Sequence, residues 1–387
     1  MTEPLFWKNP YKKEFEATII GVKKEGVVLD QTLFYPGGGG QASDRGILKN
    51  GALTFKVDNV IKQENEIVHH IALDFQDQLK EGDIITGKID WEYRYGLMKA
   101  HSSQHIFSAV ILRKFNIETT RIDIEFEDVT LNLAQKINYD WLKSALIETN
   151  EICISVNHEI VGEIISFEDA EKISNEIRGV LPKEDQIRLI RAENCDIVCC
   201  GGTHVQNSIE IGPLIIYSFK KGKNLKYYVG NKAIKLLSEL DVGILNSAQL
   251  LGQPINKINE TIEKQTSIIS KLQQENIDLA IKTMSILSKN PVITIKNIAI
   301  YILEIEIENI ILSKEFYNFP LNSLLIINIG NNRIKVLSKC HEIMANDVIQ
   351  YLTRTYGGKG GGSNQSAQAL LDSKPKEILS DLKSFLT

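Results

Sequence analysis

MKAHSSQHIF, residues 98–107, is the stretch that decides how this chain folds, and its distant counterpart is VCCGGTHV, residues 198–205. His101 and His105 stand four residues apart in a predicted helix, which brings both imidazoles to one face. Cys200 and His204 flank a short segment with two glycines, which permits a tight turn. Nitrogen and sulfur ligands of this kind suit zinc best. The two motifs therefore predict one zinc ion held by His101, His105, Cys200 and His204.

Neither motif is specific by itself, because histidines four residues apart are common on the polar faces of helices. The alternative is that these are unrelated polar and core residues. Their occurrence in one chain, with a glycine run upstream, favours the metal site. Because the ligands come from segments far apart in sequence, such a site forms only when the domain folds.

Composition indicates an ordinary soluble globular protein. The chain has 387 residues, which suggests two to three domains, and 43% hydrophobic and 24% charged residues. Its apolar runs are too short to span a bilayer, and the first residues lack a secretory signal, so we expect a cytoplasmic protein. The five cysteines are expected to be thiols in a reducing compartment. A net charge of -5 gives no bulk attraction to nucleic acid, so RNA binding requires local patches.

The predicted fold class is α+β, in four parts. Short strands with regular turn signals predict a small antiparallel β-barrel over residues 1–92. Residues 93–235 alternate helices and strands around the metal motifs, and residues 236–290 are helical. Ile258, Ile262, Gln265, Ile269, Leu272, Asn276 and Leu279 follow coiled-coil spacing there, which predicts helix pairing within the chain or between two chains. Residues 291–387 mix strands and helices in a C-terminal α/β domain.

Two glycine-rich stretches predict close approach of the backbone to another group. The run Gly37–Gly40 is followed by Gln41, and consecutive glycines are usually kept where the backbone must approach something closely. A flexible hairpin tip is the alternative. The stretch GGKGGG, residues 357–362, follows a predicted helix and is expected to be a loop that binds phosphates or sugars, with a flexible linker as the alternative.

These motifs occur in an order that resembles one family. FYPGGGGQASDRG, HSSQH, CCGGTHV, a helical segment and GGKGGG follow one another as in the editing half of alanyl-tRNA synthetase and in the free-standing AlaX proteins. The resemblance covers residues 15–362 and is closest to the long form of AlaX. It implies a DHHA1-like, tRNA-binding C-terminal domain. Only 33 residues precede Phe34, too few for an aminoacylation domain, so we expect editing without charging.

The resemblance implies the reaction and its site. The expected activity is zinc-dependent hydrolysis of the ester that joins serine or glycine to alanine tRNA, with His101, His105, Cys200 and His204 as zinc ligands. The hydroxyl of Thr119 or Thr120 is expected to bind the serine hydroxyl. The sequence departs from the synthetase at two places near this site. The Gln-Lys-Gly-Ser stretch of the synthetase is missing, and Gln104 stands where a threonine is common. The candidate substrate-binding or catalytic residues are Gly38, Gly39, Gly40, Gln41, Asp44, Gln104, Thr120 and Thr203.

The same resemblance suggests where tRNA binds. Arg94, two helical turns before His101, is expected either to contact RNA or to form a salt bridge. The basic cluster near residue 220 consists either of solvated lysines or of phosphate contacts. The candidate tRNA-binding residues are Arg94, Lys220, Lys221, Lys223, Gly357, Gly358, Lys359, Gly360, Gly361 and Gly362. A homodimer through the helical segment or the C-terminal domain is a further expectation.

Three alternatives remain open from the sequence. The chain could edit another mischarged tRNA, such as serine on threonine tRNA. It could be a tRNA-binding protein with a structural zinc and no turnover. It could be a phosphoesterase, because similar terminal domains occur on such enzymes, but no Asp-His-His motif is present.

Overall fold

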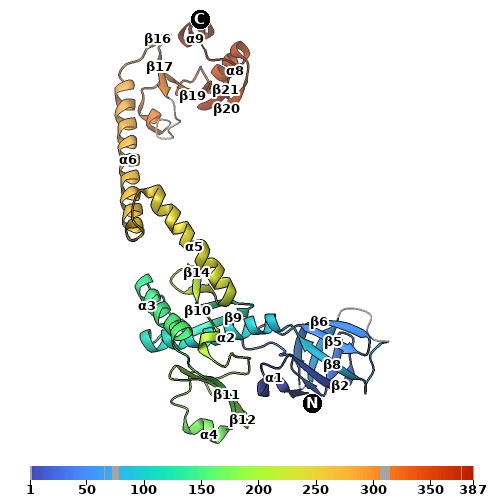
Figure 1. Cartoon of the computed structure of the whole chain (residues 1–387). Helices are drawn as coiled ribbons and strands as arrows, with labels where there is room; N and C mark the ends of the chain where they lie inside the picture. Colours follow the sequence, from blue (N-terminus) through green and yellow to red (C-terminus); the bar gives the residue numbers. More distant parts are fainter. Residues whose placement is uncertain (1, 65, 72–77, 306–313, 376, 387) are drawn as a thin grey trace. The chain divides into compact units, whose positions relative to one another are not determined.

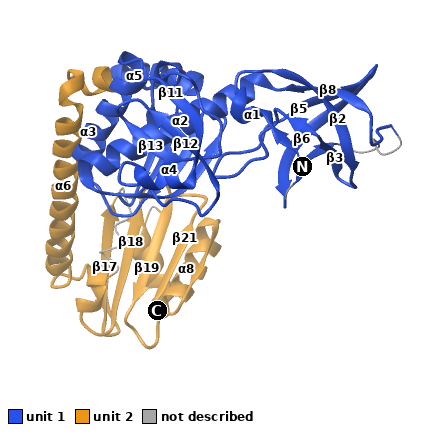
Figure 2. Cartoon of the chain, turned by 90° about the horizontal axis from the view of Figure 1, so that it is seen from below, with its two compact units in different colours: residues 1–246 blue, residues 247–387 orange. Residues whose placement is uncertain are grey.

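The computed structural model describes residues 2–64, 66–71, 78–305, 314–375 and 377–386. Contacts divide the chain into two compact units, Met1–Asn246 and Ser247–Thr387, coloured separately in Figure 2. The predicted α+β class is confirmed, as is the small N-terminal barrel. Among the described residues, no helix combines the length and the apolar character needed to cross a bilayer. The division into four domains stays a prediction.

The first unit begins with a closed six-stranded barrel (Figure 1). In β2, Phe15, Ala17 and Ile19 alternate with more exposed residues, so one face of the strand fills the barrel core. The barrel order is β2 (Glu14–Val22), β3 (Gly26–Leu29), β7 (Glu66–Ile71), β6 (Leu53–Gln63), β5 (Gly46–Asn50) and β8 (Ile84–Ile89). Beside it lie β1 (Glu3–Pro4), α1 (Leu5–Lys8) and β4 (Gln31–Thr32).

The predicted metal-bearing helix is α2 (Trp91–Phe115). Its N-terminus is capped by Asp90, whose side chain accepts a hydrogen bond from the Tyr93 N–H, and it ends at Asn116 in the left-handed conformation. Every residue from Ala100 to Ile111 is buried. The polar HSSQH segment therefore lies inside the protein, where its side chains need hydrogen bonds or a bound ion.

Two antiparallel sheets pack with α2 around one apolar core. Strand β13 ends at Cys199, which places Cys200 at the exit of the strand beside the helix. The four-stranded sheet has the order β14 (Ile215–Lys220), β15 (Asn224–Tyr228), β10 (Asp128–Leu133) and β9 (Thr119–Glu125). The three-stranded sheet has the order β11 (Ile160–Ser166), β12 (Gln186–Ala192) and β13 (Asp196–Cys199). The connecting helical segments are α3 (Tyr139–Asn150), a π-helical turn (Glu151–Ser155), α4 (Phe167–Lys172) and a 3-10 turn (Ser208–Glu210).

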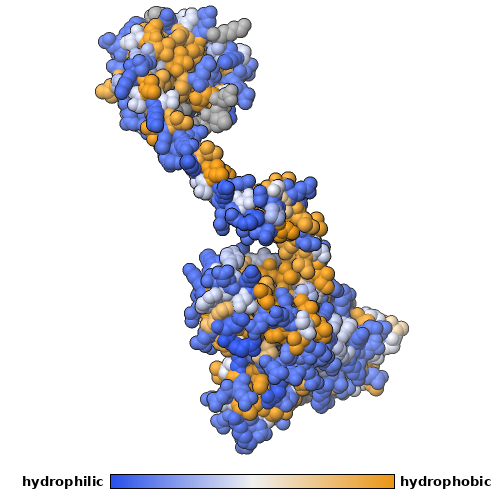
Figure 3. Space-filling model, turned by 60° about the vertical axis from the view of Figure 1, so that its left-hand side comes forward, coloured by the Kyte–Doolittle hydropathy of each residue, from blue (hydrophilic) through white to orange (hydrophobic). Residues whose placement is uncertain are grey.

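Long helices follow the part of the chain that contains the four predicted metal ligands. They are α5 (Gly230–Leu251), within which the boundary between the units falls, and α6 (Ile258–Leu287), preceded by a 3-10 turn (Ile255–Lys257). On α6, the predicted seam residues Ile262, Ile269, Leu272 and Leu279 are between 48% and 63% exposed. Hydrophobic side chains reach the surface in several places in Figure 3. Pairing of this face with another helix remains a prediction.

The second unit is built on a six-stranded sheet covered on both faces. Helices α8 (Ala345–Tyr356) and α9 (Ile378–Leu386) pack on one face, and Met284 at the end of α6 packs on the other, beside a 3-10 turn (Phe316–Asn318). Strands β17 and β18 are parallel and the other neighbours are antiparallel. The order is β16 (Ile293–Ile295), β17 (Ile298–Ile305), β18 (Ser323–Ile329), β19 (Arg333–Ser338), β21 (Ser366–Leu370) and β20 (Lys359–Gly362).

The prediction of a loop over residues 357–362 is wrong for its larger part. Gly357 and Gly358 connect α8 to the sheet, but Lys359–Gly362 forms the exposed edge strand β20. A Cβ atom at Gly358, Gly360 or Gly362 would lie within 2.5 Å of atoms of β21. These three glycines are therefore explained by close packing of two strands.

Candidate metal centre

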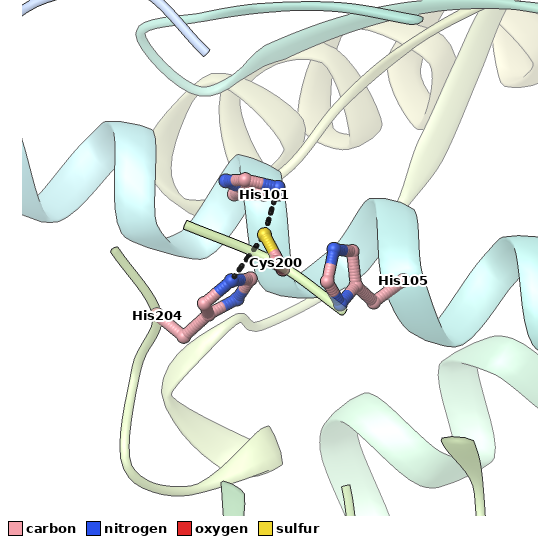
Figure 4. Close-up of side chains that lie close together, drawn as sticks. All are labelled: His101, His105, Cys200 and His204. Carbon is pink, nitrogen blue, oxygen red and sulfur yellow. Dashed lines mark hydrogen bonds between the residues drawn. The ribbon is translucent and has the colours of Figure 1, made fainter. Parts of the chain in front are cut away.

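The four predicted metal ligands lie together inside the first unit (Figure 4). Their ligand atoms are all within 4.8 Å of one another. The Cys200 Sγ lies 3.4 Å from the His101 Nε2 and 3.4 Å from the His204 Nε2. The three histidine side chains are 2%, 5% and 6% exposed. The helix and the loop thus form one enclosed group, as the sequence predicts.

Gln41, from the barrel, fixes which nitrogen of His101 faces the group. The Thr203 backbone N–H can only donate, and it donates to the Gln41 Oε1 at 3.1 Å. The Gln41 atom that accepts this hydrogen bond must therefore be the amide oxygen. The Gln41 amide nitrogen donates to the Thr203 hydroxyl at 2.9 Å. The same Oε1 lies 2.7 Å from the His101 Nδ1, so Nδ1 carries the proton. The Nε2 lone pair is left to face the Cys200 sulfur, which is the state a metal ligand needs.

The other two histidines fit a bound cation as well. The His204 Nδ1 lies 3.2 Å from the Ser102 Oγ, which also accepts from the Val205 N–H. The His105 Nδ1 is buried and has no hydrogen-bond partner in the described part of the chain. Three imidazoles and one thiol are a donor set that suits Zn²⁺.

Burial keeps the ligands in the protonation states that metal binding requires. Desolvation, aided by the positive charge of Arg188, lowers the pKa of His101 to about 3. Desolvation also lowers the pKa of His105 and His204 well below the usual value for histidine. The imidazoles are therefore neutral near pH 7. Burial raises the pKa of the Cys200 thiol, opposed by the Gly202 N–H and by Arg188, so a metal ion would have to displace its proton.

The glycine run brings the barrel to the metal-bearing part of the unit. Gly38 and Gln41 exchange two backbone hydrogen bonds of 3.0 Å around a turn in which Gly39 and Gly40 have φ angles of 59° and 87°. The Gly40 carbonyl accepts a hydrogen bond from the Ile124 N–H of β9. A Cβ atom added at Gly40 would lie 2.8 Å from the Ile122 carbonyl oxygen of the same strand. Gly38, Gly39 and Gly40 are exposed, and Gly39 faces open space.

Asp44 and Arg94 need correction as predicted functional residues. Both are buried, and the Arg94 Nε donates to both Asp44 carboxylate oxygens at 2.8 and 2.9 Å. The Tyr35 N–H donates to the same carboxylate, and an Arg94 N–H donates to the Leu33 carbonyl. Arg94 is 0% exposed, so it cannot contact RNA, and the salt-bridge alternative is the right one. The pair fastens the segment after the glycine run to α2.

Other predicted substrate contacts have protein partners. The Thr203 hydroxyl accepts a hydrogen bond from the Gln41 side chain. The Thr120 side chain is exposed and donates to the Asn132 carbonyl at 3.4 Å. The buried Gln104 Nε2 donates to the Ser108 Oγ at 2.8 Å, which also accepts from the Thr119 hydroxyl at 3.1 Å. Residues 101, 104, 105 and 108 share one face of α2. Thr119, the other threonine considered, therefore reaches the helix face that carries the ligands.

The basic cluster lies on the hairpin between β14 and β15. Lys220 and Lys221 are exposed, whereas Lys223 is half-buried and its Nζ donates to the Ala134 carbonyl at 2.8 Å. Lys223 is therefore a poorer candidate for a phosphate contact than its neighbours. In the second unit, Lys359 and Gly361 lie on the exposed strand β20.

Two residues that the sequence did not single out hold the metal loop. Arg188, on β12, donates through Nη1 to the carbonyl oxygens of Cys200 at 2.6 Å and Gly202 at 2.9 Å. Trp7, on α1, donates through Nε1 to the carbonyl between them, that of Gly201, at 2.7 Å. A lone arginine and a lone tryptophan far from the motifs carry no recognisable spacing, so no sequence pattern indicated them.

Comparisons with known proteins agree with this architecture. A family model described as class II (A) tRNA synthetases matches residues 5–93. The alanyl-tRNA editing protein AlaX-L of Pyrococcus horikoshii is 30% identical over 410 aligned residues that cover 100% of both chains. An alanine–tRNA ligase of Sulfurisphaera tokodaii is 26% identical over 100% of this chain and 44% of the ligase. One from Methanothrix thermoacetophila is 29% identical over 73% of this chain and 32% of the ligase.

The chain thus falls in the class of proteins that resemble one part of alanine–tRNA ligases, since it spans less than half the length of the ligases compared. The match over the full length of both chains is decisive. The chain belongs to the AlaX family of alanyl-tRNA editing proteins.

Proposed function

We propose that this protein hydrolyses the ester that joins serine or glycine to the 3′ end of alanine tRNA. The observation that carries this proposal is the match to an alanyl-tRNA editing protein along the whole of both chains. In the reaction, water adds to the acyl carbon and the bond to the ribose oxygen breaks. One proton of the water goes to the ribose oxygen, which leaves as the hydroxyl, and the other is released to solvent as the amino acid leaves as its carboxylate.

His101, His105, Cys200 and His204 would hold one Zn²⁺. A zinc ion bound there supplies positive charge that orients the aminoacyl group. Four protein ligands leave no open position, and an open position is what zinc enzymes that activate water retain. Water activation is therefore assigned to polar groups of the chain and to the tRNA hydroxyl.

The glycine turn is the proposed partner of the reacting ester. The N–H groups of Gly39 and Gly40 have no hydrogen-bond partner among the residues described, and Gly38, Gly39 and Gly40 are exposed. Backbone N–H groups held by a rigid turn can stabilise the negative charge that develops on the carbonyl oxygen during acyl transfer. Gln41 positions His101 and Thr203 in this account and does not contact the substrate.

Selectivity against alanine is assigned to the hydroxyl of Thr119, together with Gln104 and Ser108. Gln104 and Ser108 lie on the ligand face of α2, and Thr119 of β9 donates to Ser108, so the three side chains are joined by hydrogen bonds. A site that binds the serine hydroxyl leaves a polar group unpaired when alanine is bound, and such sites discriminate strongly.

Binding of tRNA is assigned to exposed cations in both units. Lys220 and Lys221 lie on the β14–β15 hairpin and Lys359 on the β20 edge of the DHHA1-like domain. With a net charge of -5, the chain can attract RNA only through such local groups. The proposed setting is the cytoplasm, where translation takes place, and a dimer through α6 or the second unit is part of the proposal.

The test compares one amino acid on two tRNAs. We expect hydrolysis of serine from alanine tRNA to exceed hydrolysis of serine from threonine tRNA, measured as release of radiolabelled serine. The reverse preference would assign the protein to the alternative, editing of another mischarged tRNA. Absence of hydrolysis of either by the zinc-loaded protein would leave a tRNA-binding protein with a structural metal.

A further inference from the structure

The loop that carries Cys200 is held by a cation and an aromatic ring at the edge of the metal centre. Arg188 binds the carbonyl oxygens of Cys200 and Gly202, and Trp7 binds that of Gly201. The Arg188 guanidinium carbon lies 5.9 Å from the centre of the Trp7 ring. Both side chains are only partly buried. They therefore combine a fixed position with access to solvent.

Arg188 is a cation without a carboxylate partner. Its hydrogen bonds use Nη1 alone, and among the described residues no carboxylate forms an ion pair with it. The nearby Arg178 is neutralised by Asp196, whose carboxylate accepts from it at 2.6 and 2.8 Å. A divalent ion with one thiolate ligand and three neutral imidazoles is itself positive. Adding Arg188 leaves this region with uncompensated positive charge, which favours an anionic ligand.

The geometry points to a subsite for the terminal nucleotide of RNA, in which Arg188 binds the last phosphodiester and the Trp7 ring stacks on the terminal base. This inference rests on the proposed function and adds the residues that hold the end of the substrate. An arginine beside an aromatic ring is suited to a single-stranded nucleotide, because the guanidinium binds phosphate oxygens and the ring offers a stacking surface. Nε1 of Trp7 is already fixed by Gly201, so the ring is oriented before the substrate binds.

The test uses three serine esters of decreasing size: one of a cytidylyl-adenosine dinucleotide, one of adenosine without phosphate, and the ethyl ester. For Arg188→Ala we expect kcat/KM to fall about tenfold or more on the dinucleotide ester, because a charge-assisted hydrogen bond is lost. The adenosine ester lacks the phosphate, so its kcat/KM should fall only by what the lost contacts to the metal loop cost, about tenfold less than the fall on the dinucleotide ester. An equal loss on both esters would mean that Arg188 acts only by holding the metal loop, and would overturn the inference.

Trp7 offers an independent pair of variants. Trp7→Phe keeps an aromatic ring but removes the hydrogen bond to Gly201, whereas Trp7→Leu removes the ring as well. If the base stacks on the ring, kcat/KM on the adenosine ester should be about tenfold lower for Trp7→Leu than for Trp7→Phe. On the ethyl ester, which has no base, the two variants should have the same kcat/KM. Equal activity of the two variants on the adenosine ester would contradict stacking. This comparison decides the inference even if Arg188→Ala fails to fold or to retain zinc.

Zinc content and wild-type turnover separate the two proposals. Each variant is compared at equal zinc content measured by atomic absorption. If the wild type cleaves none of the esters, nor serine from intact alanine tRNA, the proposed function itself has failed. If the wild type is active but cleaves the dinucleotide and adenosine esters with the same kcat/KM, the function stands and the phosphate contact is excluded.

Discussion

Gln41 and His101, which are 60 residues apart, share a hydrogen bond of 2.7 Å between Oε1 and Nδ1. One residue belongs to the segment that leaves the barrel and the other to the buried helix α2. Through this contact the barrel determines which nitrogen of His101 is free to bind a metal. The arrangement of the metal centre therefore depends on the docking of the glycine run.

The first prediction concerns this contact. Gln41→Leu should lower zinc affinity by about 10-fold to 100-fold, because the hydrogen bond that fixes the orientation and the tautomer of the His101 ring is lost. Affinity is measured by competition with a chromophoric chelator. Gln63→Leu, an exposed position at the end of β6, is the matched control and should bind zinc like the wild type. Equal affinities in the two variants would show that Gln41 does not orient His101.

The second prediction separates stability from catalysis at Asp44. Asp44→Ala leaves Arg94 as a buried charge without its partner and should reduce the free energy of unfolding by about 3–5 kcal/mol in urea denaturation. Glu14→Ala breaks the Glu14–Lys88 pair, whose side chains are more than half exposed, and should leave the free energy of unfolding nearly unchanged. A small loss for Asp44→Ala would return this residue to the list of candidate substrate contacts.

The group of three histidines and Cys200, the barrel and the long helices could be predicted because each has a local sequence signature. HSSQH has helical spacing, the barrel strands have regular turn signals, and α6 has an apolar repeat. For Arg94 the sequence could not decide between a salt bridge and RNA, and it did not predict Asp44 as the partner, since burial of an ion pair depends on how barrel and helix dock. Residues 359–362 were mistaken for a loop because three of the four residues are glycines, which carry no strand signal. Arg188 and Trp7 act through backbone carbonyls, a contact that no residue spacing encodes.

The third prediction distinguishes the neighbouring threonines. Thr119→Val should reduce the preference for serine over alanine esters of alanine tRNA by about tenfold or more, because the Thr119 hydroxyl that donates to Ser108 is lost. Thr120→Val removes an equivalent hydroxyl from the exposed side and should leave the preference intact. The readout is the ratio of kcat/KM for the two esters. If Thr120→Val has the larger effect, the assignment is reversed.

The fourth prediction concerns strand β20. Gly360→Ala should destabilise the protein by about 1–3 kcal/mol, since its Cβ would lie 2.5 Å from the Ala369 Cβ. Gly361→Ala should be nearly neutral, because the nearest atom to its Cβ, the Asn346 Oδ1, is 3.9 Å away. Thermal unfolding of both variants measures the difference. Similar unfolding temperatures would contradict the close-packing explanation.

Binding of tRNA through the same strand has its own readout. Lys359→Ala should make the dependence of log affinity on log salt concentration shallower by about one, the effect of one lost phosphate contact. Lys374→Ala, an exposed lysine in the same unit, is the matched control. Unchanged slopes in both variants would exclude Lys359 from the tRNA-binding surface.

The central claim is that the buried group of His101, His105, Cys200 and His204 supports removal of the wrong amino acid from alanine tRNA. The most direct measurement compares the rates of release of serine and alanine from alanine tRNA by the wild type, Cys200→Ala and Cys199→Ala. The adjacent Cys199 is also a free thiol but lies outside the metal group, so it serves as the matched control. We predict release of serine, with alanine spared, by the wild type and Cys199→Ala, and loss of that activity in Cys200→Ala. Undiminished release of serine by Cys200→Ala, at a zinc content well below that of the wild type, would contradict the account.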